Sequence, residues 1–430
     1  MPGVDAQRRL ILFGRYPVPG RTNTRLIPVV GPLGAAELQR QWTERAVAVL
    51  KGSRLAPVAF VYADGTAQQV RRWLGREGIE LIPQVQGDLG QRMAAALADG
   101  LHRGASQVVL LGTDVPRMTA RHLEMAFEAL AGHDLVLGPA RDGGYWLVGC
   151  RKAADVFTGI PWGTPEVLAQ TMARAQAHGL SLALLPPMDD IDTPADLAAL
   201  HGGRQGYAPF LSVVIPTLNE AVRIGPAVAE VMAPDIEVIV ADGGSRDDTV
   251  FKAKAAGATV ITAEPGRAVQ QNAGAHLAKG SALLFLHADT RLPGDFGARV
   301  FECLLDPAVV LGAFHFQTDW DHWAMHAIAR LTNARSRRLK LPYGDQGFFL
   351  RKRVFDRVGG FPMVPIAEDL LLARRLAPSG RIALAPGAAV TSSRRWRRRG
   401  IVRTTLINAV IAGGLLLGIS PDRLAGLYHR

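Results

Sequence analysis

Residues 282–290, with the sequence Ala-Leu-Leu-Phe-Leu-His-Ala-Asp-Thr, contain the segment that decides the predicted fold. The five apolar residues from Ala282 to Leu286 have no helical period, so they predict a strand buried in a parallel sheet. Open α/β sheets bind their ligands at the carboxyl ends of their strands, and Asp289 follows this strand directly. Asp289 is therefore a candidate ligand of a divalent cation. An aspartate that only caps the following turn is the alternative.

The composition is that of a globular α/β protein with more than one domain. The chain has 430 residues, of which 48% are hydrophobic and 20% charged, and it is too long for one ordinary core. Its net charge of +11 favours anionic partners such as nucleotides and anionic lipid. The two cysteines lie far apart in the sequence, which indicates neither a disulfide framework nor a cysteine metal site. We expect no signal peptide and a cytoplasmic location.

The chain consists of two halves with the same plan of strands and helices. Each half begins with an apolar strand, and its central apolar strand ends in an aspartate, Asp114 or Asp289. Because strands alternate with helical patterns, we expect βαβ units and a mainly parallel sheet in each half. Residues 201–209 are rich in glycine and polar residues, which is typical of a junction. We therefore predict two α/β domains, residues 1–205 and residues 209–430.

The first half combines a basic loop with separate aspartates. Residues 14–26 contain glycines, prolines and arginines, and such a loop can bind phosphate through backbone amides and guanidinium groups. Glycines 143 and 144 would let the backbone approach a ligand closely. Asp192 is either a second metal carboxylate or part of the helix cap that precedes Pro194. The candidate site residues of this half are Arg15, Gly20, Arg25, Asp114, Asp142, Gly143 and Asp192.

Residues 8–200 resemble a family of nucleotidyltransferase-like proteins found beside radical-SAM and selenodomain genes. The shared motifs are Arg-x-Pro-x-Pro-Gly with Thr-Arg-Leu, Gly-Thr-Asp, Gly-Pro-x-x-Asp-Gly-Gly-Tyr, Pro-Trp-Gly-Thr-Pro and Asp-x-Asp-Thr-Pro-x-Asp-Leu. The family usually has lysine before Thr-Arg-Leu, whereas this chain has Asn23. The resemblance implies that this half makes or binds a nucleotide-activated donor. The alternative, favoured by Asn23, is a non-catalytic binding or scaffold domain.

The second half carries four further motifs in a fixed order. These are Val-Val-Ile-Pro-Thr-Leu-Asn-Glu, Asp-Gly-Gly-Ser-x-Asp-Asp-Thr, Gly-Arg-x-x-Gln-x-Asn-x-Gly and Leu-His-Ala-Asp-Thr, within residues 213–290. We expect Asp242 to face the same crevice as Asp289, because parallel strands present their carboxyl ends together. A carboxylate there can accept the imino proton of a uracil or bind ribose hydroxyls, and Arg267 is a candidate contact for the diphosphate.

The motif order from residue 211 to about residue 400 resembles a family 2 glycosyltransferase, an inverting enzyme with a nucleotide-sugar-binding, Rossmann-like fold. Together the two resemblances imply tandem nucleotide-diphospho-sugar transferase domains. The resemblance implies a nucleotide-sugar donor and a Mg²⁺ or Mn²⁺ cofactor, held by Asp289 with His287 as a further candidate ligand. The candidate donor-binding residues are Pro216, Glu220, Asp242, Gly243, Arg267, Asp345, Arg395 and Trp396.

Glu368 and Asp369 are the candidate catalytic pair. By resemblance one of them is the base, with Asp369 the usual choice, and a positioned carboxylate can take the proton of an attacking acceptor hydroxyl. The alternative is that both acids only favour a helix N-terminus. Arg395 and Trp396 resemble a reduced form of a segment that closes over the diphosphate in processive relatives, so a processive polymerase is disfavoured.

The C-terminal tail is basic and apolar. Residues 401–419 are barely long enough to span a bilayer, so we expect an interfacial or docked amphipathic helix, against lipid, against the tail's own domain or in a dimer contact. The tail resembles a subgroup associated with arsenosugar biosynthesis. We expect a small-molecule or lipid acceptor and peripheral membrane contact through the tail. Nucleic-acid binding through residues 394–399 is disfavoured, because these residues form no known reader module.

Overall fold

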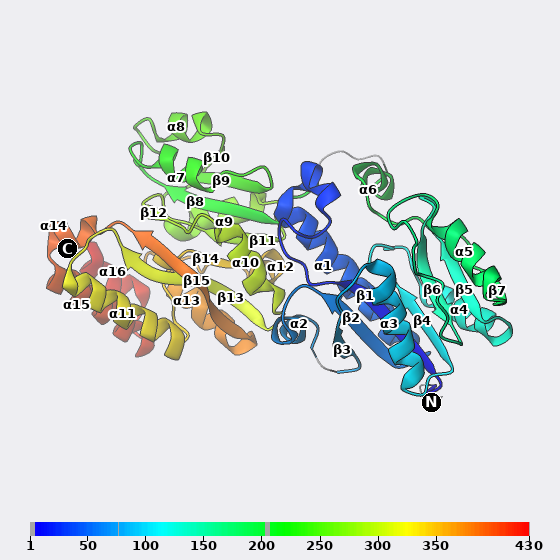
Figure 1. The fold of residues 1–430 in the computed structure, drawn as a ribbon. Coiled ribbons are helices and arrows are strands. Elements are labelled where there is room, and N and C mark those ends of the chain that lie inside the picture. The colour runs from blue at the N-terminus through cyan, green and yellow to red at the C-terminus, as the bar shows by residue number, and fades with distance from the viewer. Residues whose placement is uncertain (1–4, 76, 203–206, 430) are drawn as a thin grey trace. The chain divides into compact units, whose positions relative to one another are not determined.

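The computed structural model describes residues 5–75, 77–202 and 207–429, and it divides the chain into two compact units, residues 1–206 and 207–430. Residues 203–206, inside the predicted junction, lie outside the described residues. Each unit contains one sheet with helices packed on it (Figure 1). Each unit is described by itself below.

The sheet of the first unit has the strand order β3-β2-β1-β4-β6-β5-β7. Most neighbouring strands run parallel, and β6 alone among them is antiparallel to both of its neighbours. The apolar strands β1 and β4 lie in the centre, as their continuous hydrophobic runs predict. The elements are β1 (Arg8–Arg15), α1 (Ile27–Ser53), β2 (Val58–Ala63), α2 (Ala67–Leu74), β3 (Glu80–Pro83), α3 (Leu89–His102), β4 (Gln107–Leu111), α4 (Ala120–Gly132), β5 (Leu135–Pro139), β6 (Tyr145–Cys150), α5 (Val167–Ala177), β7 (Leu182–Leu184) and α6 (Pro194–Leu200).

The sheet of the second unit has the strand order β10-β9-β8-β11-β14-β13-β15-β12. Strands β8 to β11 form one parallel part, β14 joins β11 in the antiparallel direction, and β13 and β15 form a further parallel pair. The elements are β8 (Leu211–Thr217), α7 (Ile224–Val231), β9 (Ile236–Asp242), α8 (Thr249–Ala255), β10 (Thr259–Thr262), α9 (Arg267–Leu277), β11 (Ala282–Phe285), β12 (Thr290–Arg291), α10 (Phe296–Leu305), β13 (Val309–Thr318), α11 (Trp323–Arg338), β14 (Phe348–Arg351), α12 (Lys352–Arg357), α13 (Glu368–Leu376), β15 (Arg381–Thr391), α14 (Arg394–Arg399), α15 (Ile401–Leu416) and α16 (Pro421–His429). Two mixed, parallel-rich α/β sheets therefore confirm the predicted fold class.

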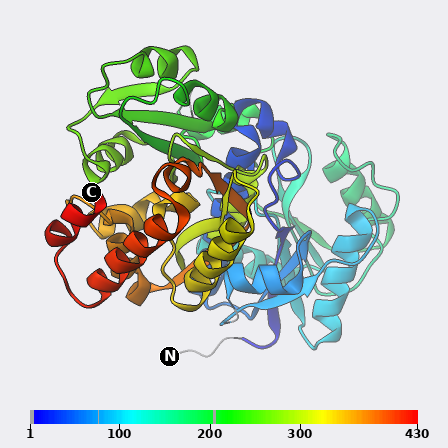
Figure 2. The same cartoon turned by 90° about the vertical axis from the view of Figure 1, so that its left-hand side faces the viewer.

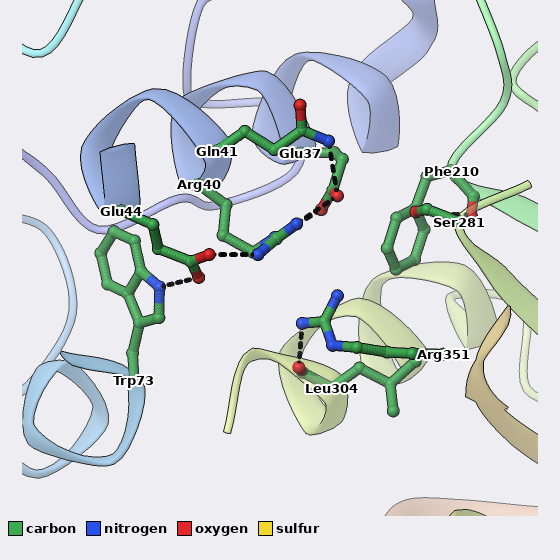
Figure 3. Close-up of polar contacts among 9 residues, drawn as sticks. All are labelled: Glu37, Arg40, Gln41, Glu44, Trp73, Phe210, Ser281, Leu304 and Arg351. Carbon is green, nitrogen blue, oxygen red and sulfur yellow. Dashed lines mark hydrogen bonds and ion pairs between the residues drawn. The ribbon is translucent and has the colours of Figure 1, made fainter. Parts of the chain in front are cut away.

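Buried polar contacts tie helices and strands together inside each unit (Figure 3). In the first unit, Arg40 of α1 pairs with Glu37 and Glu44, and Glu44 accepts a hydrogen bond from the Trp73 indole of α2 at 2.9 Å. In the second unit, Arg351 at the end of β14 donates to the carbonyl oxygen of Leu304 at the end of α10. Such contacts satisfy polar groups that burial would otherwise leave without partners.

The C-terminal tail folds back onto the second unit. Ile411 and Leu415 of α15 are buried in one apolar cluster with Leu341, Ile366 and Leu370. The guanidinium of Arg374 on α13 donates to the carbonyl oxygen of Leu415 at 2.8 Å. The tail thus docks on its own domain, which is one of the expected arrangements. No helix among the described residues has the length and apolar character needed to cross a membrane.

Candidate active sites

The second unit has a cavity of about 560 Å³ at the carboxyl ends of β8 and β11. Parallel strands bring their ends to the same edge of the sheet, which explains why motifs far apart in the sequence meet there. The cavity is lined by nine of the predicted residues, Pro216, Glu220, Arg267, His287, Asp289, Asp345, Asp369, Arg395 and Trp396. Three of the predicted residues, Asp242, Gly243 and Glu368, are not among its lining residues.

The segment after β11 is held by backbone hydrogen bonds that present His287 and Asp289 to the cavity. The amide of Thr290 donates to the carbonyl oxygen of His287 at 3.0 Å, which closes a tight turn. The amide of Ser392 donates to the carbonyl oxygen of Asp289, also at 3.0 Å. This second bond, together with the pairing of β12 and β15, brings the Arg395 segment beside the aspartate.

His287 is a neutral imidazole at pH 7. Burial, together with the charges of Arg267 and Arg395 and against the opposing charge of Asp369, lowers the pKa of His287 to about 4. A neutral imidazole is the form that can ligate a metal. Arg267, Asp369 and Arg395 therefore all lie near enough to His287 to influence its charge.

Three acids, Asp345, Glu368 and Asp369, stand close together around the start of α13. The carboxylate of Asp369 accepts hydrogen bonds from the amides of Gly344 at 2.6 Å and Leu370 at 2.7 Å, so its orientation is defined. Burial, and then the charge of Asp369, raise the pKa of Asp345 to about 7 and the pKa of Glu368 to about 7. Glu368 is only 4% exposed and is not among the residues that line the cavity. Asp369 is thus the acid of the pair that faces the cavity.

The residues present fit a divalent cation that completes its coordination with a substrate. One carboxylate oxygen of Asp345 is buried and has no hydrogen-bond partner, as expected of a group that awaits a ligand. Within residues 5–75, 77–202 and 207–429, no three His, Cys, Asp or Glu side chains form a group that could hold a metal ion alone. Mg²⁺ sites commonly use one or two carboxylates together with substrate phosphates, so Asp289 with a diphosphate is chemically sufficient.

Asp242 organises its own loop in this structure. It is 2% exposed, and its carboxylate accepts hydrogen bonds from the amides of Gly244 at 2.9 Å and Ser245 at 2.8 Å. The Ser245 hydroxyl and the Thr217 hydroxyl donate to it as well. The expectation that Asp242 faces the cavity with Asp289 is therefore not met here, because the glycine-rich turn folds over its carboxylate. Gly243 packs against the amide of Gln270.

Trp396 combines a buried position with an unsatisfied donor. Its indole is 8% exposed and packs on Phe316 and Met325, while its Nε1 has no hydrogen-bond partner. The neighbouring Arg394 lies 3.5 Å from the carboxylate of Glu220.

The tail residues Asn408, Ile411 and Ala412 also line the cavity. Sequence reasoning missed these three, since nothing in an apolar tail indicates which wall it covers.

In the first unit, four carboxylates interact at the carboxyl ends of β4 and β5. Burial, and then the charge of Asp192, raise the pKa of Asp114 to about 6. Burial, and then the charges of Asp142 and Asp114, raise the pKa of Asp190 to about 7. The structure therefore brings the three predicted aspartates together. It adds Asp190, which was hidden in the sequence among the acids of residues 189–192 and could have been found from that run.

The helix cap before α6 is made by Thr193 rather than by Asp192. The Thr193 hydroxyl accepts the amide of Asp196, and Pro194 occupies the first turn. Asp192 instead pairs with Arg25 of the basic loop, with 3.2 Å between Nη1 and Oδ2. The helix cap is therefore made by Thr193. The Asp192 carboxylate remains part of the cluster, where it stays a candidate metal ligand.

The basic loop and the glycine turn of this unit are shaped by positive φ angles. Gly20 (φ 79°) and Asn23 (φ 48°) both adopt the left-handed conformation, which asparagine tolerates better than lysine does. Arg15 lies 3.7 Å from Asp64. Gly143 (φ 93°) approaches the backbone of Pro165 so closely that no side chain fits there. The close approach predicted for Gly143 is therefore to the protein's own chain.

Two family matches divide the chain at the same place as the two units. Residues 46–164 match the family described as DUF2064, uncharacterized proteins conserved in bacteria. Residues 212–361 match glycosyl transferase family 2. These matches support a fusion of two transferase-like domains, whereas the radical-SAM and arsenosugar associations are not part of them.

Curated relatives are known for both halves. The 3-phospho-D-glycerate guanylyltransferase of Phenylobacterium zucineum is 31% identical over 204 residues, which cover 42% of this chain and 90% of that protein. The glucosyl-3-phosphoglycerate synthase of Mycolicibacterium smegmatis is 43% identical over 77 residues, 17% of this chain. The chain spans only 23% of the length of that synthase.

Solved structures are similar to parts of the chain. One described as a nucleotide-diphospho-sugar transferase from Desulfovibrio desulfuricans is 35% identical, with a TM-score of 0.43, over 45% of this chain and 86% of its own. A mannosyltransferase of Pyrobaculum calidifontis, solved with GDP-mannose and Mn²⁺, is 21% identical, with a TM-score of 0.38, over 52% of this chain and 69% of its own. The chain belongs in its first half to the family of 3-phospho-D-glycerate guanylyltransferase, and it carries a glycosyltransferase domain of family 2 in its second half.

Proposed function

We propose that the second unit transfers a sugar, with inversion, from a nucleotide-diphosphate donor to a small-molecule or lipid acceptor. The observation that carries this proposal is that Asp289, Asp345 and Asp369 line the same cavity as Arg267 and Arg395. Carboxylates and guanidinium groups in one cavity suit a reaction in which a hydroxyl loses a proton while a diphosphate gains negative charge.

The proposed roles follow from that division of charge. Asp369 takes the proton of the acceptor hydroxyl as its oxygen attacks the anomeric carbon, and the bond from that carbon to the diphosphate oxygen breaks. Arg267 and Arg395 stabilise the negative charge of the departing nucleoside diphosphate. A Mg²⁺ or Mn²⁺ ion held by Asp289 and His287 would supply further Lewis-acid stabilisation of that diphosphate.

Release of nucleoside diphosphate from a panel of UDP- and GDP-sugars, in the presence of Mn²⁺, tests this proposal. We expect Asp289→Ala to abolish both the release and the Mn²⁺-dependent binding of the nucleoside diphosphate. Asp321→Asn, at an aspartate whose side chain is 99% exposed, is the matched control and should leave both unchanged. Equal activity of Asp289→Ala and the native protein would refute the assigned cation site.

For the first unit we propose guanylyl transfer to a phosphorylated hydroxy acid. In such a reaction a phosphate oxygen of the acid attacks the α-phosphorus of GTP, and the bond to the bridging oxygen breaks to release pyrophosphate. Family membership and the carboxylate cluster around Asp114 support this proposal. The fused pair further suggests that the first unit makes or supplies the activated donor that the second unit uses.

The alternative for the first unit is a non-catalytic binding or scaffold domain, and Asn23 is the observation that favours it. Pyrophosphate release from GTP with 3-phospho-D-glycerate, the acid named in that relative, distinguishes the two. We expect release by the native protein and its loss in Asp114→Asn, with exposed Asp189→Asn as control. A different result is that the native protein releases no pyrophosphate while Asn23→Lys releases it or binds GTP more tightly. That result would indicate a catalytic site that Asn23 has inactivated. No effect of either variant would support the scaffold.

The remaining features of the function stay predictions. An arsenosugar-type acceptor rests on the sequence resemblance of the tail, and a cytoplasmic location rests on the use of cysteine. Peripheral membrane contact through the tail also stays a proposal.

A further inference from the structure

The basic residues of the chain are concentrated in two segments of the second unit. Residues 322–344 contain five lysines and arginines, residues 391–421 contain six, and neither segment contains an aspartate or glutamate. Their eleven positive charges equal the net charge of the whole chain, +11. The rest of the protein is therefore neutral on balance, and these two segments account for the excess.

The two segments lie side by side in the folded unit (Figure 2). They form α11, followed by the chain to Gly344, and the tail helices α14 and α15. Met325 of α11 packs against Trp396 of α14, together with Ile328 and Ile401. Leu341, just after α11, packs against Ile411 and Leu415 of α15. The shared apolar clusters place α11 and α15 near one another, and we call the exposed residues of these two segments the basic face.

The basic face also exposes large apolar side chains in a regular pattern. Val402, Leu406 and Val410 of α15, spaced four residues apart, are 72%, 59% and 53% exposed. Leu331 of α11 is 71% exposed, and Leu339 after it is 60% exposed. The inner side of α15 is already buried, so this outer stripe is not needed for the folding of the unit.

Exposed basic side chains belong to the same two segments as the stripe. Arg330, Arg338 and Lys340 lie on the α11 side, and Arg398 lies on the α14 side. An apolar stripe framed by arginine and lysine, on a helix that is too short to cross a bilayer, is the pattern of an interfacial helix on anionic lipid. A nucleic acid would match the charges but leave the apolar stripe without a partner.

We propose that the basic face docks on an anionic membrane surface. The inference deepens the proposed glycosyl transfer and rests on it for its purpose. The opposite side of α15 contributes Asn408 and Ile411 to the cavity wall, so a docked enzyme would hold its cavity beside acceptors carried by lipid. α15 is thus one helix with two functions, lining the cavity on one side and meeting the lipid on the other.

Sedimentation of the full-length protein with vesicles tests the proposal, without donor or metal. We expect binding to vesicles that contain phosphatidylglycerol and little binding to phosphatidylcholine alone. The triple variant Arg330→Gln, Arg338→Gln, Lys340→Gln should bind on the order of 100-fold more weakly, because each basic residue near an anionic surface contributes about a factor of five. The matched control Lys252→Gln, Lys254→Gln, Arg353→Gln changes exposed charges elsewhere in the unit and should bind as the native protein does.

A second variant separates lipid from other polyanions. Val402→Ser, Leu406→Ser, Val410→Ser keeps every charge and should weaken vesicle binding at least about tenfold, since it removes apolar area that lipid would bury. Its control is Val222→Ser, Phe251→Ser, at side chains that are 80% and 73% exposed. Binding that survives the triple serine change, or that occurs with duplex DNA and not with vesicles, would overturn the inference. If the protein transfers sugar but binds no vesicles, the membrane proposal is refuted and the proposed glycosyl transfer is retained. If it binds vesicles but transfers no sugar, the glycosyl transfer is refuted and the membrane proposal is retained.

Discussion

Single carboxylates in this chain differ in charge because their surroundings differ. Asp369 lies in the cavity and is oriented by two backbone amides, whereas its neighbour Glu368 is buried, and burial raises the pKa of Glu368 to about 7. Burial also raises the pKa of Asp345 to about 7. Two adjacent acids at the start of α13 therefore have different surroundings, with Asp369 facing the cavity and Glu368 inside the core.

Asp369→Asn should lower kcat by about 10²- to 10⁴-fold, the usual contribution of a general base, with little change in the affinity for nucleoside diphosphate. The amide has nearly the same shape as the carboxylate but cannot take the proton. Steady-state kinetics with the donor found in the sugar panel, and calorimetric binding of the nucleoside diphosphate, measure the two effects. A parallel loss of binding and kcat would show that Asp369 holds the nucleotide instead of acting as the base.

The carboxylate cluster of the first unit should make stability depend on pH. Folding raises the pKa of Asp190 from the ordinary value of 3.8 to about 7 and that of Asp114 to about 6. The folded state then binds more protons than the unfolded state between about pH 4 and 7, so the contribution of the cluster to stability falls as the pH rises through this range.

Asp190→Asn should therefore raise the free energy of unfolding by about 1–2 kcal/mol at pH 8, after allowance for solvent screening, and by little at pH 4. Chemical denaturation at the two pH values measures the difference. The neighbouring Asp189→Asn is the control, because Asp189 is exposed and pairs with Arg141 at 2.7 Å. That change should cost about 0.5 kcal/mol or less. A gain for Asp190→Asn that is equal at both pH values would argue against repulsion between the carboxylates.

At the scale of elements, close packing between strands depends on small residues at particular positions. Gly312 of β13 lies opposite Phe349 of β14, whose ring is fully buried. A Cβ atom on Gly312 would overlap that ring, and the tight core leaves the ring no space to move.

Gly312→Ala should destabilise the second unit by about 1–3 kcal/mol through overpacking. Denaturant unfolding followed by tryptophan fluorescence measures the loss. Gly294→Ala is the matched control, since nothing lies within 4 Å of the added carbon and the φ of Gly294 is not positive. Equal stability of the two variants would mean that the β13–β14 contact is looser than described.

The whole molecule joins two sheets that each have a candidate site at the carboxyl ends of their strands. The first unit concentrates carboxylates around Asp114, and the second unit combines carboxylates with the arginines of its cavity. The two sites should therefore differ in the nucleotides that they bind and respond to separate substitutions.

Thermal shifts of the full-length protein with Mn²⁺ and single nucleotides should separate the two sites. A ligand at about 100 times its dissociation constant stabilises the folded state by about 2.7 kcal/mol. We expect a nucleoside diphosphate shift that disappears in Asp289→Ala but persists in Asp114→Asn. A GTP shift should show the opposite dependence. Loss of both shifts in either single variant would contradict two independent sites.

Much of this architecture could be predicted from local sequence. The apolar runs before Asp114 and Asp289 predicted the central strands, because a strand buried on both faces needs continuous hydrophobic residues. The carboxyl end of the second of these strands then predicted where Asp289 would lie, and Asp289 lines the cavity of the second unit, whereas Asp242, expected in the same crevice, does not. The strand predictions depend only on the hydrophobic pattern along the chain and on the direction of the strands. Residues close together in the sequence determine both.

Tertiary packing decided the rest. The loop after β9 folded over Asp242, burial separated Glu368 from Asp369, and Asp190 joined the carboxylates of the first unit. The tail came to line the cavity through Asn408 while exposing Val402 and its stripe. Which face of a helix is buried, and which carboxylate is desolvated, depends on partners far away in the sequence. A local pattern therefore identifies the candidate residues, and only the packed structure determines which of them share a site.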